Sequence, residues 1–396
     1  METFEDRWRS ALAARADADL MRARRHFAGA QSVHLRLAGR DYISFASNDY
    51  LGLAGDSELR EKFAQAVART GVGSGASHMV CGHHEEHHAL ELELATFTGR
   101  DKALVFSSGY AANLAVLGTL ASRKDVILQD KLNHASLLDG ANLSGARSQR
   151  FLHGNVSSLQ SCLQRFAGGD KAGTNVLVAT DGVFSMDGDL APLPEMVAAC
   201  QPYHALMVVD DAHGMGVLGD EGRGTLQAFG LTQTEVPVLI GTFGKAFGTA
   251  GAFVAGPALL MDYLEQFARP YIYTTAMPPA LAAVTRHSLR LVVAGDARRS
   301  LLQQRISQFK QACAEQQFEL MPSDTAIQPL VVGSSGATMK LGAFLEQHGL
   351  LTGQIRPPTV PEGKARLRIT LSSAHSENDI LRLIQTLIAA RQEGLV

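Results

Sequence analysis

The sequence predicts an α/β protein with a large, mostly parallel sheet domain and a smaller α+β domain formed from both chain ends. Between residues 45 and 290, short apolar runs alternate with helical stretches. Near-continuous apolar strands separated by helices are typical of a parallel sheet covered on both faces. From about residue 290 the pattern changes to long helices with two or three strands. We therefore expect an N-terminal helix and hairpin that joins the small domain (1–44), the large domain (45–290) and the C-terminal small domain (291–396).

The expected elements follow the chain in order. Residues 3–28 are expected to form an amphipathic helix, because Phe4, Trp8 and Leu12 recur at helical spacing among charged residues. Two short runs flanking Ala-Gly-Arg predict a hairpin over 33–45. Apolar runs predict the strands of the large sheet at 103–106, 125–129, 175–180, 205–210, 236–241 and 251–256. The same criterion predicts strands of the small domain at 326–333 and 365–371.

Composition narrows the functional class. The 396 residues carry a formal charge of −3, and the lack of a basic excess argues against nucleic acid or an anionic membrane as the main partner. No apolar run reaches the roughly 18 residues of a membrane span, and the N-terminus carries no apolar signal segment. The widely spaced cysteines favour reduced thiols. We expect a soluble cytoplasmic protein.

Charged residues follow two neighbouring predicted strands of the large sheet. One strand ends at Asp210 and Asp211, and Lys245 lies in a glycine-flanked turn after the next strand. In such sheets ligands bind at the carboxyl ends of the strands, and loss of hydration lowers the pKa of a lysine, as a nucleophilic amine requires. The pair suits pyridoxal phosphate (PLP), because Lys245 can form a Schiff base while Asp210 keeps the pyridine nitrogen protonated. The alternative is an ordinary salt bridge, which does not account for the glycines.

Other residues at strand ends could complete a PLP site. Gly109 and Tyr110 begin a helix directly after a strand, so their backbone N–H groups could hold a phosphate. Thr242 offers the same phosphate a hydroxyl group. His134 follows another strand and could stack on a planar ring, although a lone histidine is more often a surface residue. The side chains of Ser185 and His213 could form hydrogen bonds with the phenolic oxygen of the ring.

Six motifs resemble the α-oxoamine synthases, a PLP-dependent family of the fold-type I, aspartate aminotransferase-like class: SNDYLGL, GSGAS, NHASLLDG, GVFSMDGD, VDDAHGMGVLG and TFGKAFG. The resemblance implies that Lys245 is the Schiff-base lysine, that Asp210 pairs with the ring nitrogen and that His134 stacks on the ring. It also implies a homodimer with active sites at the interface. In that dimer the segment YIYTTAMPP lends two hydroxyl groups to the neighbouring subunit's phosphate, those of Thr274 and Thr275.

The resemblance also implies the reaction and its substrates. Members condense an amino acid with an acyl thioester and release carbon dioxide. Arg368 is similar to the arginine that holds the amino acid carboxylate, a task that suits a planar, bidentate donor; an exposed strand charge is the alternative. Arg356, in IRPPTVPEG, resembles the members that use a pimeloyl thioester, whose acyl chain ends in a second carboxylate, and a surface charge is again the alternative. Arg22 resembles a residue near the acyl channel.

The implied activity is therefore an acyltransferase of biotin biosynthesis, which joins L-alanine to a pimeloyl thioester of CoA or of an acyl carrier protein. A sister activity with glycine and a short acyl-CoA is the nearest alternative. Comparing kcat/KM for alanine with a pimeloyl thioester and for glycine with acetyl-CoA would distinguish the two activities.

An alternative from another class rests on the letters H-E-x-x-H. His84, Glu85 and His88 have the spacing of a helical zinc site with a neighbouring general base. No third ligand follows in the H-E-x-x-H-x-x-G-x-x-H pattern, and in the family the histidine position is that of His87. Apolar residues recur from Leu90 to Phe97, so the sequence predicts a helix start here, with Glu91 and Glu93 facing outward and no metal site.

Overall fold

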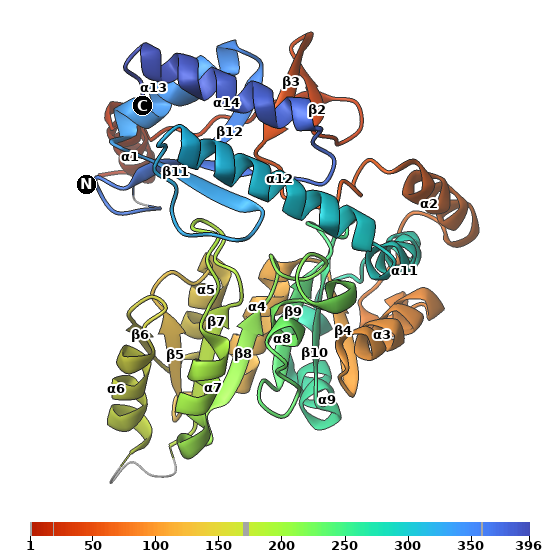
Figure 1. The fold of residues 1–396 in the computed structure, drawn as a ribbon. Coiled ribbons are helices and arrows are strands. Elements are labelled where there is room, and N and C mark those ends of the chain that lie inside the picture. Colours follow the sequence, from red (N-terminus) through yellow and green to blue (C-terminus); the bar gives the residue numbers. More distant parts are fainter. Residues whose placement is uncertain (1, 19, 169–173, 358) are drawn as a thin grey trace.

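The computed structural model describes residues 2–18, 20–168, 174–357 and 359–396. Its larger sheet has seven strands in the order β4-β10-β9-β8-β7-β5-β6. All pairs from β9 to β6 are parallel, whereas β10 runs antiparallel to both β4 and β9. The mostly parallel sheet is therefore confirmed (Figure 1). The strands are β4 (Lys102–Phe106), β5 (Val126–Asp130), β6 (Arg147–Phe151), β7 (Val176–Asp181), β8 (Leu206–Asp210), β9 (Val238–Thr242) and β10 (Ala252–Gly256).

Helices cover both faces of this sheet, because alternate strand residues point to opposite sides and both sets are apolar. One buried cluster joins the strands to α4 (Gly109–Leu120), α5 (Ala135–Ser144) and α9 (Ala258–Phe267). A second cluster joins them to α3 (Glu85–Thr98), α6 (Val156–Ala167) and α7 (Leu193–Cys200). Shorter helical turns complete this part, namely η1 (His78–Gly82), η3 (Gln201–Tyr203), η4 (Asp220–Gly222), α8 (Thr225–Ala228) and α10 (Arg269–Ile272).

The smaller sheet combines the two ends of the chain, as expected, in the order β1-β2-β3-β12-β13-β11. The strand from the N-terminal end, β3, pairs in parallel with β12 from the C-terminal end. The strands are β1 (Phe27–Ala28), β2 (His34–Leu37), β3 (Arg40–Phe45), β11 (Ile327–Gly333), β12 (Leu350–Ile355) and β13 (Ala365–Thr370). The remaining helices are α2 (Ser57–Thr70), α11 (Pro279–Val293), α12 (Asp296–Glu315), α13 (Ser335–Gln347) and α14 (Glu377–Gln392).

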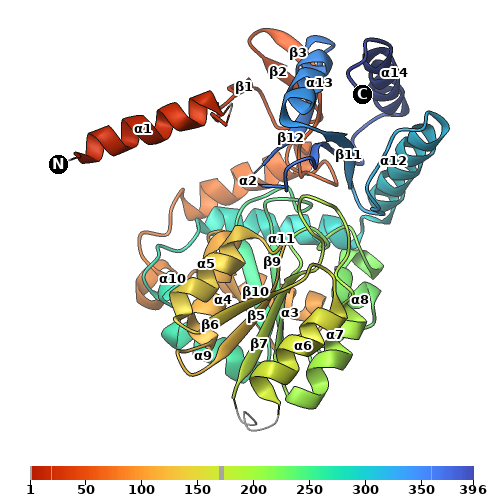
Figure 2. The same ribbon diagram turned by 90° about the vertical axis from the view of Figure 1, so that its left-hand side faces the viewer.

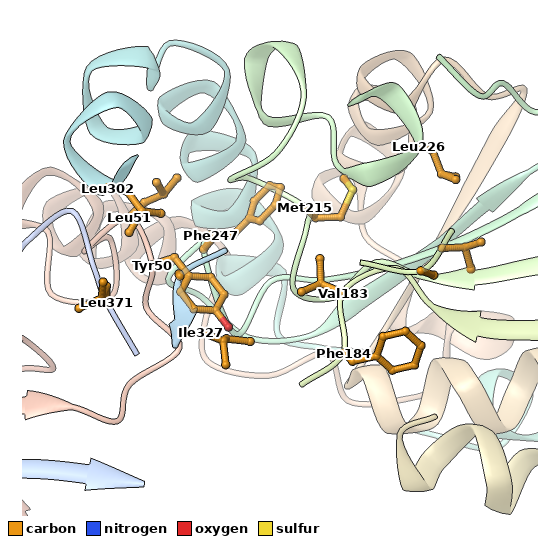
Figure 3. Packing of buried hydrophobic residues seen from close by; sticks show 14 of the residues in the cluster. Tyr50, Leu51, Val183, Phe184, Met215, Leu226, Phe247, Leu302, Ile327 and Leu371 are labelled. Atoms are coloured by element: carbon orange, nitrogen blue, oxygen red, sulfur yellow. The ribbon is translucent and has the colours of Figure 1, made fainter. Parts of the chain in front are cut away.

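One apolar core continues from the large sheet into the small one. The same cluster contains Phe247 from the turn after β9, Tyr50 from the segment after β3 and Ile327 from β11 (Figure 3). Because this packing is continuous, the strand ends of the large sheet lie directly beneath the small sheet (Figure 1). Functional side chains from both sheets can therefore meet there. The domain limits after residues 44 and 290 stay predictions, and α11 runs past the second of them.

Three differences from the expected elements have physical reasons. The helix expected over 3–28 is α1 (Phe4–Asp17), because Phe27 and Ala28 pair with β2 as a strand instead. In Figure 2, α1 projects from the body, and none of its residues is buried. Two strands lack a continuous apolar run and were not expected. They are the polar edge strand β6 and the glycine-containing β12. The expected hairpin is confirmed and turns at Ala38 and Gly39, both with positive φ.

No helix in the described ranges is both long enough and apolar enough to span a lipid bilayer.

Candidate active site

Asp210 is the last residue of β8, and Lys245 lies in the turn after β9. The carboxyl ends of these two strands lie beneath the small sheet (Figure 1). Lys245 follows β9 by three residues and is half-buried. Loss of hydration lowers the pKa of its amine from 10.5 to about 8, although the negative charges of Asp210 and Asp181 act in the opposite direction. The predicted environment of a nucleophilic lysine is therefore present in the structure. Among the described residues no carboxylate forms an ion pair with Lys245.

Asp210 is buried, and both of its carboxylate oxygens are held in place. Oδ1 accepts a hydrogen bond from the backbone N–H of Ala212 at 3.0 Å, and Oδ2 accepts one from the side-chain amide Nδ2 of Asn113 at 2.6 Å. No described cation forms an ion pair with this carboxylate. A buried, fixed carboxylate without a cation is costly, so the arrangement fits a ligand that brings a positively charged N–H group, such as a protonated pyridine ring.

Two residues that the sequence did not single out connect Asp210 to His134. Asn113 also donates to Ser136 Oγ at 2.8 Å, and Ser136 Oγ lies 2.6 Å from His134 Nδ1. Asp181, at the end of β7, accepts the backbone N–H of His134 at 2.8 Å. Burial lowers the pKa of His134, which favours the neutral ring. Asn113 lies one helical turn after Tyr110, and that spacing is the signal in the sequence that could have identified it.

Gly109 and Thr242 adjoin each other, as the expected phosphate site requires. A Cβ atom placed on Gly109 would lie 3.9 Å from Thr242 Oγ1, so a side chain would fill the space beside this hydroxyl. Gly109 is the first residue of α4, and Ser108 caps that helix by accepting the N–H of Ala111. A helix N-terminus with open space beside it suits an anion. The Tyr110 side chain is exposed and donates to Asp139.

The small sheet supplies Arg368 from β13 to the same region. Its Nε donates to the backbone oxygen of Ser185 at 2.6 Å, and its Nη groups donate to Thr370 and Asn48 at 2.7 and 3.1 Å. The side chain is 7% exposed. Three of the five guanidinium N–H groups thus hold neutral oxygens, and two are left for a ligand. An exposed strand charge is therefore excluded, and a buried arginine beside Ser185 can bind a carboxylate.

His213 is buried and lies 2.6 Å from the hydroxyl group of Tyr50, measured to Nδ1. Burial, and then the positive charges of Lys245 and Arg368, hold the pKa of His213 well below its usual range. A neutral His213 can therefore share hydrogen bonds with a hydroxyl or phenolate oxygen. Tyr50 was not among the predicted site residues, although it belongs to the motif SNDYLGL.

Arg22 and Arg356 line one pocket of about 270 Å³. Met186 lines the same pocket and follows Ser185, whose backbone Arg368 binds. Residues from the N-terminal segment and from the loop after β12 thus meet next to the segment that Arg368 contacts. Arg15 lines this pocket as well, and three arginines at one pocket are suited to a carboxylate at the far end of an acyl chain.

A family model described as "Aminotransferase class I and II" matches residues 40–387 of this chain. The chain belongs to this family. It is 53% identical over 377 residues to 8-amino-7-oxononanoate synthase of Marinobacter nauticus, covering 95% of this chain and 94% of that protein. It is 52% identical to the Cellvibrio japonicus enzyme of the same name over 366 residues, covering 92% and 91%. The resemblance to PLP-dependent α-oxoamine synthases is confirmed.

Two solved structures agree with the fold. Serine palmitoyltransferase from S. paucimobilis superimposes with a TM-score of 0.93 at 29% identity and covers all of both chains. 8-Amino-7-oxononanoate synthase from Francisella tularensis superimposes with a TM-score of 0.78 at 30% identity, covering 90% of this chain and 99% of that one. The fold-type I architecture is thereby confirmed.

Two predicted site residues lie away from this group. Thr274 and Thr275 are exposed, and Thr275 bridges to Ser77 before η1. Among the described residues no hydrogen bond joins either threonine to Lys245. Their role at a neighbouring subunit's phosphate therefore stays a prediction that depends on the dimer.

The H-E-x-x-H letters mark a helix start, as expected. His84 is the N-cap of α3 and accepts the N–H of Glu86 at 3.2 Å, whereas the buried His87 lies 2.7 Å from the backbone oxygen of Met277 through its Nε2. The outward orientation predicted for Glu91 is wrong. Glu91 is 8% exposed, because its side chain turns towards β4 and accepts the N–H of Val105.

The pKa of Lys245 makes a direct prediction. In protein freed of cofactor, the rate at which an amine-directed acylating reagent modifies Lys245 should rise with pH through a midpoint near 8, because the amine loses its proton there. Exposed lysines should titrate near 10.4. Peptide mass spectrometry after short pulses measures both rates in one sample. A midpoint for Lys245 at that of the exposed lysines would contradict the environment described here.

Proposed function

We propose that this protein has 8-amino-7-oxononanoate synthase activity, joining L-alanine to a pimeloyl thioester with release of carbon dioxide and the free thiol. The observation that carries the proposal is the placement of Lys245 and Asp210 beneath Arg368, with Arg22 and Arg356 at an adjoining pocket. The relatives that bear this name are about half identical over nearly the whole chain.

The cofactor of the proposed reaction is PLP, and the residues described above fit it. Lys245 would hold it covalently, Asp210 would pair with its ring nitrogen, and His134 would stack on the ring. When bound, PLP withdraws the electron pair that forms on the amino acid Cα. We propose that Gly109, Tyr110 and Thr242 contact the phosphate of PLP. Ser185 and His213 would contact its phenolic oxygen.

The side chains of this protein then carry the remaining steps. Arg368 binds the alanine carboxylate and orients the Cα–H bond. The amino group of alanine would release Lys245 from the cofactor, and the free amine of Lys245, whose pKa is near 8, would then remove that proton as a general base suited to neutral pH. The Cα carbon bonds to the thioester carbonyl carbon, whose oxygen His134 would polarise, and the thiolate leaves. The bond between Cα and the carboxylate of the resulting β-keto acid then breaks, and carbon dioxide leaves. The electron pair that stays on Cα takes up a proton.

We propose a homodimer as the working form, because the phosphate contacts assigned to Thr274 and Thr275 require a second copy. The serine palmitoyltransferase neighbours share the fold over the whole chain. The acyl carrier, whether CoA or an acyl carrier protein, and a cytoplasmic location remain part of this proposal.

Product analysis tests the function directly. Purified protein with PLP is given alanine and pimeloyl-CoA, or glycine and acetyl-CoA, and the products are identified by mass spectrometry. We expect 8-amino-7-oxononanoate as the main product and a higher kcat/KM for the first pair. A higher kcat/KM for glycine and acetyl-CoA would assign the chain to the sister activity instead.

Arg368→Lys should raise the KM for alanine by about 10–100-fold with a smaller change in kcat, because lysine cannot hold Ser185 and a carboxylate at once. Steady-state kinetics over a range of alanine concentrations measure this. The matched control is Arg366→Lys on the same strand, a buried arginine that pairs with Asp187. An unchanged KM for alanine in the Arg368 variant would remove this residue from the amino acid site.

Arg356→Met and Arg22→Met should each lower kcat/KM for pimeloyl-CoA by about 10-fold, the cost of one charge-assisted hydrogen bond. Acetyl-CoA has no distal carboxylate, so kcat/KM for acetyl-CoA should stay unchanged. The ratio of the two values is the measurement. If kcat/KM falls equally for pimeloyl-CoA and acetyl-CoA, the pocket does not recognise the distal carboxylate.

A further inference from the structure

The histidines around the start of α3 form a cluster that the proposed function does not use. We propose that His83, His88 and Glu91 bind a divalent transition metal ion of the zinc type. One ligand atom from each of the three side chains lies within 4.8 Å of the other two. Two imidazole nitrogens and one carboxylate oxygen form a ligand set that zinc accepts at about 2.0–2.2 Å, with water completing the shell. Side-chain rotation would bring the three atoms to that distance.

One of the two carboxylate oxygens of Glu91 is free to bind a cation, whereas the other is already hydrogen-bonded. Oε1 is fixed by the backbone N–H of Val105 at 3.0 Å, and Oε2 faces Nε2 of His83 at 3.9 Å. Lys102 acts on Glu91 from β4, but its ammonium group forms ion pairs with Asp262 and Glu265. A metal ion beside Oε2 would supply the positive charge that a buried carboxylate needs.

His83 has the hydrogen-bonding arrangement of a metal ligand. Its Nδ1 lies 2.8 Å from Nδ1 of His78, and its Nε2 is thereby directed towards Glu91. Metal-binding histidines commonly donate their second ring N–H to a partner that fixes the ring. His78 is itself held by stacking on Tyr271, with ring centroids 4.8 Å apart.

The two other histidines of this segment, His84 and His87, already use ring nitrogens for hydrogen bonds within the protein. His87 uses both ring nitrogens, one for the N–H of His84 at 2.9 Å and one for the oxygen of Met277 at 2.7 Å. His84 caps α3 with its Nδ1. His88 and Glu91 are three residues apart and therefore share one face of the helix. The proposed site thus shares only His88 with the H-E-x-x-H letters.

The test measures zinc directly in untagged holoenzyme. After treatment with a chelator and dialysis against Zn²⁺, elemental mass spectrometry gives the metal content, and competition with a chromophoric chelator gives the Kd. We expect one zinc per chain. His83→Gln and His88→Gln should each weaken binding by on the order of 100-fold. His78→Phe, which keeps the stack but loses the nitrogen, should weaken it by about 10-fold.

His84→Asn is the matched control, since it removes a histidine of the same stretch but keeps a side chain that caps helices well. It should bind zinc like the unchanged protein. Because Glu91 is buried, replacing it risks losing the fold, so the two exposed histidines carry the test. The proposal is wrong if the unchanged protein retains no zinc, or if His84→Asn loses as much affinity as His83→Gln. Neither readout depends on the condensation reaction, so this outcome is independent of the proposed function.

Discussion

Replacing Lys245 by alanine should abolish the condensation, with a loss in kcat of at least about 10³–10⁴-fold. In the proposed mechanism this amine is both the attachment point of PLP and the base that takes the Cα proton. Lys131 also follows a strand of this edge, β5, but its side chain is exposed. The variant should also lack the visible absorbance of cofactor bound to lysine. Product mass spectrometry and an absorption spectrum of the purified protein measure the two effects.

The control for this experiment is Lys62→Ala, which removes an exposed lysine on α2. It should keep normal turnover and normal absorbance. Normal turnover in Lys245→Ala would overturn the assignment of the site, whereas loss of both signals in Lys62→Ala would indicate damage to the fold.

Asp210→Asn should give the second largest loss, about 10²–10³-fold in kcat, which is typical of removing one preorganised charge from an active site. The substitution keeps the size of the side chain and removes the negative charge that would hold the proton on the ring nitrogen. The amine of Lys245 would also lose a charge that raises its pKa. Its titration midpoint should therefore move below 8 in this variant.

Turnover and the labelling midpoint of Lys245 test the two effects of Asp210→Asn separately. Asp101→Asn, an exposed change at the other end of the sheet, is the control. A normal kcat in Asp210→Asn would mean that this carboxylate does not act on the ring nitrogen. A lost kcat with an unmoved midpoint would show that the charge of Asp210 does not reach Lys245.

The hydrogen-bonded chain from Asp210 through Asn113 and Ser136 to His134 explains how two distant strand ends act as one site. Each member is fixed by its neighbour, so the carboxylate of Asp210 and the imidazole of His134 keep a constant relative position. Such preorganisation is what a site that stabilises a carbanion requires.

The sequence by itself determined the fold class and the chemical centre. Buried parallel strands need continuous apolar runs, and those runs are visible locally at β4, β5, β7, β8, β9 and β10. Residues directly after such strands must lie at one edge of the sheet, which brought Asp210 and Lys245 together without knowledge of the packing. The polar edge strand β6 carries no such run and escaped prediction.

Only the tertiary structure decided which side chains meet across long stretches of sequence. Arg22 and Arg356 share a pocket although 334 positions separate their numbers, and no local pattern encodes that approach. The exposed face expected for Glu91 was wrong for the same reason, because β4 packs on α3 and supplies Val105 as its partner. In the stretch that carries H-E-x-x-H, the letters indicated one set of ligands. In the structure His84 caps α3 instead, and the set that we propose is His83, His88 and Glu91.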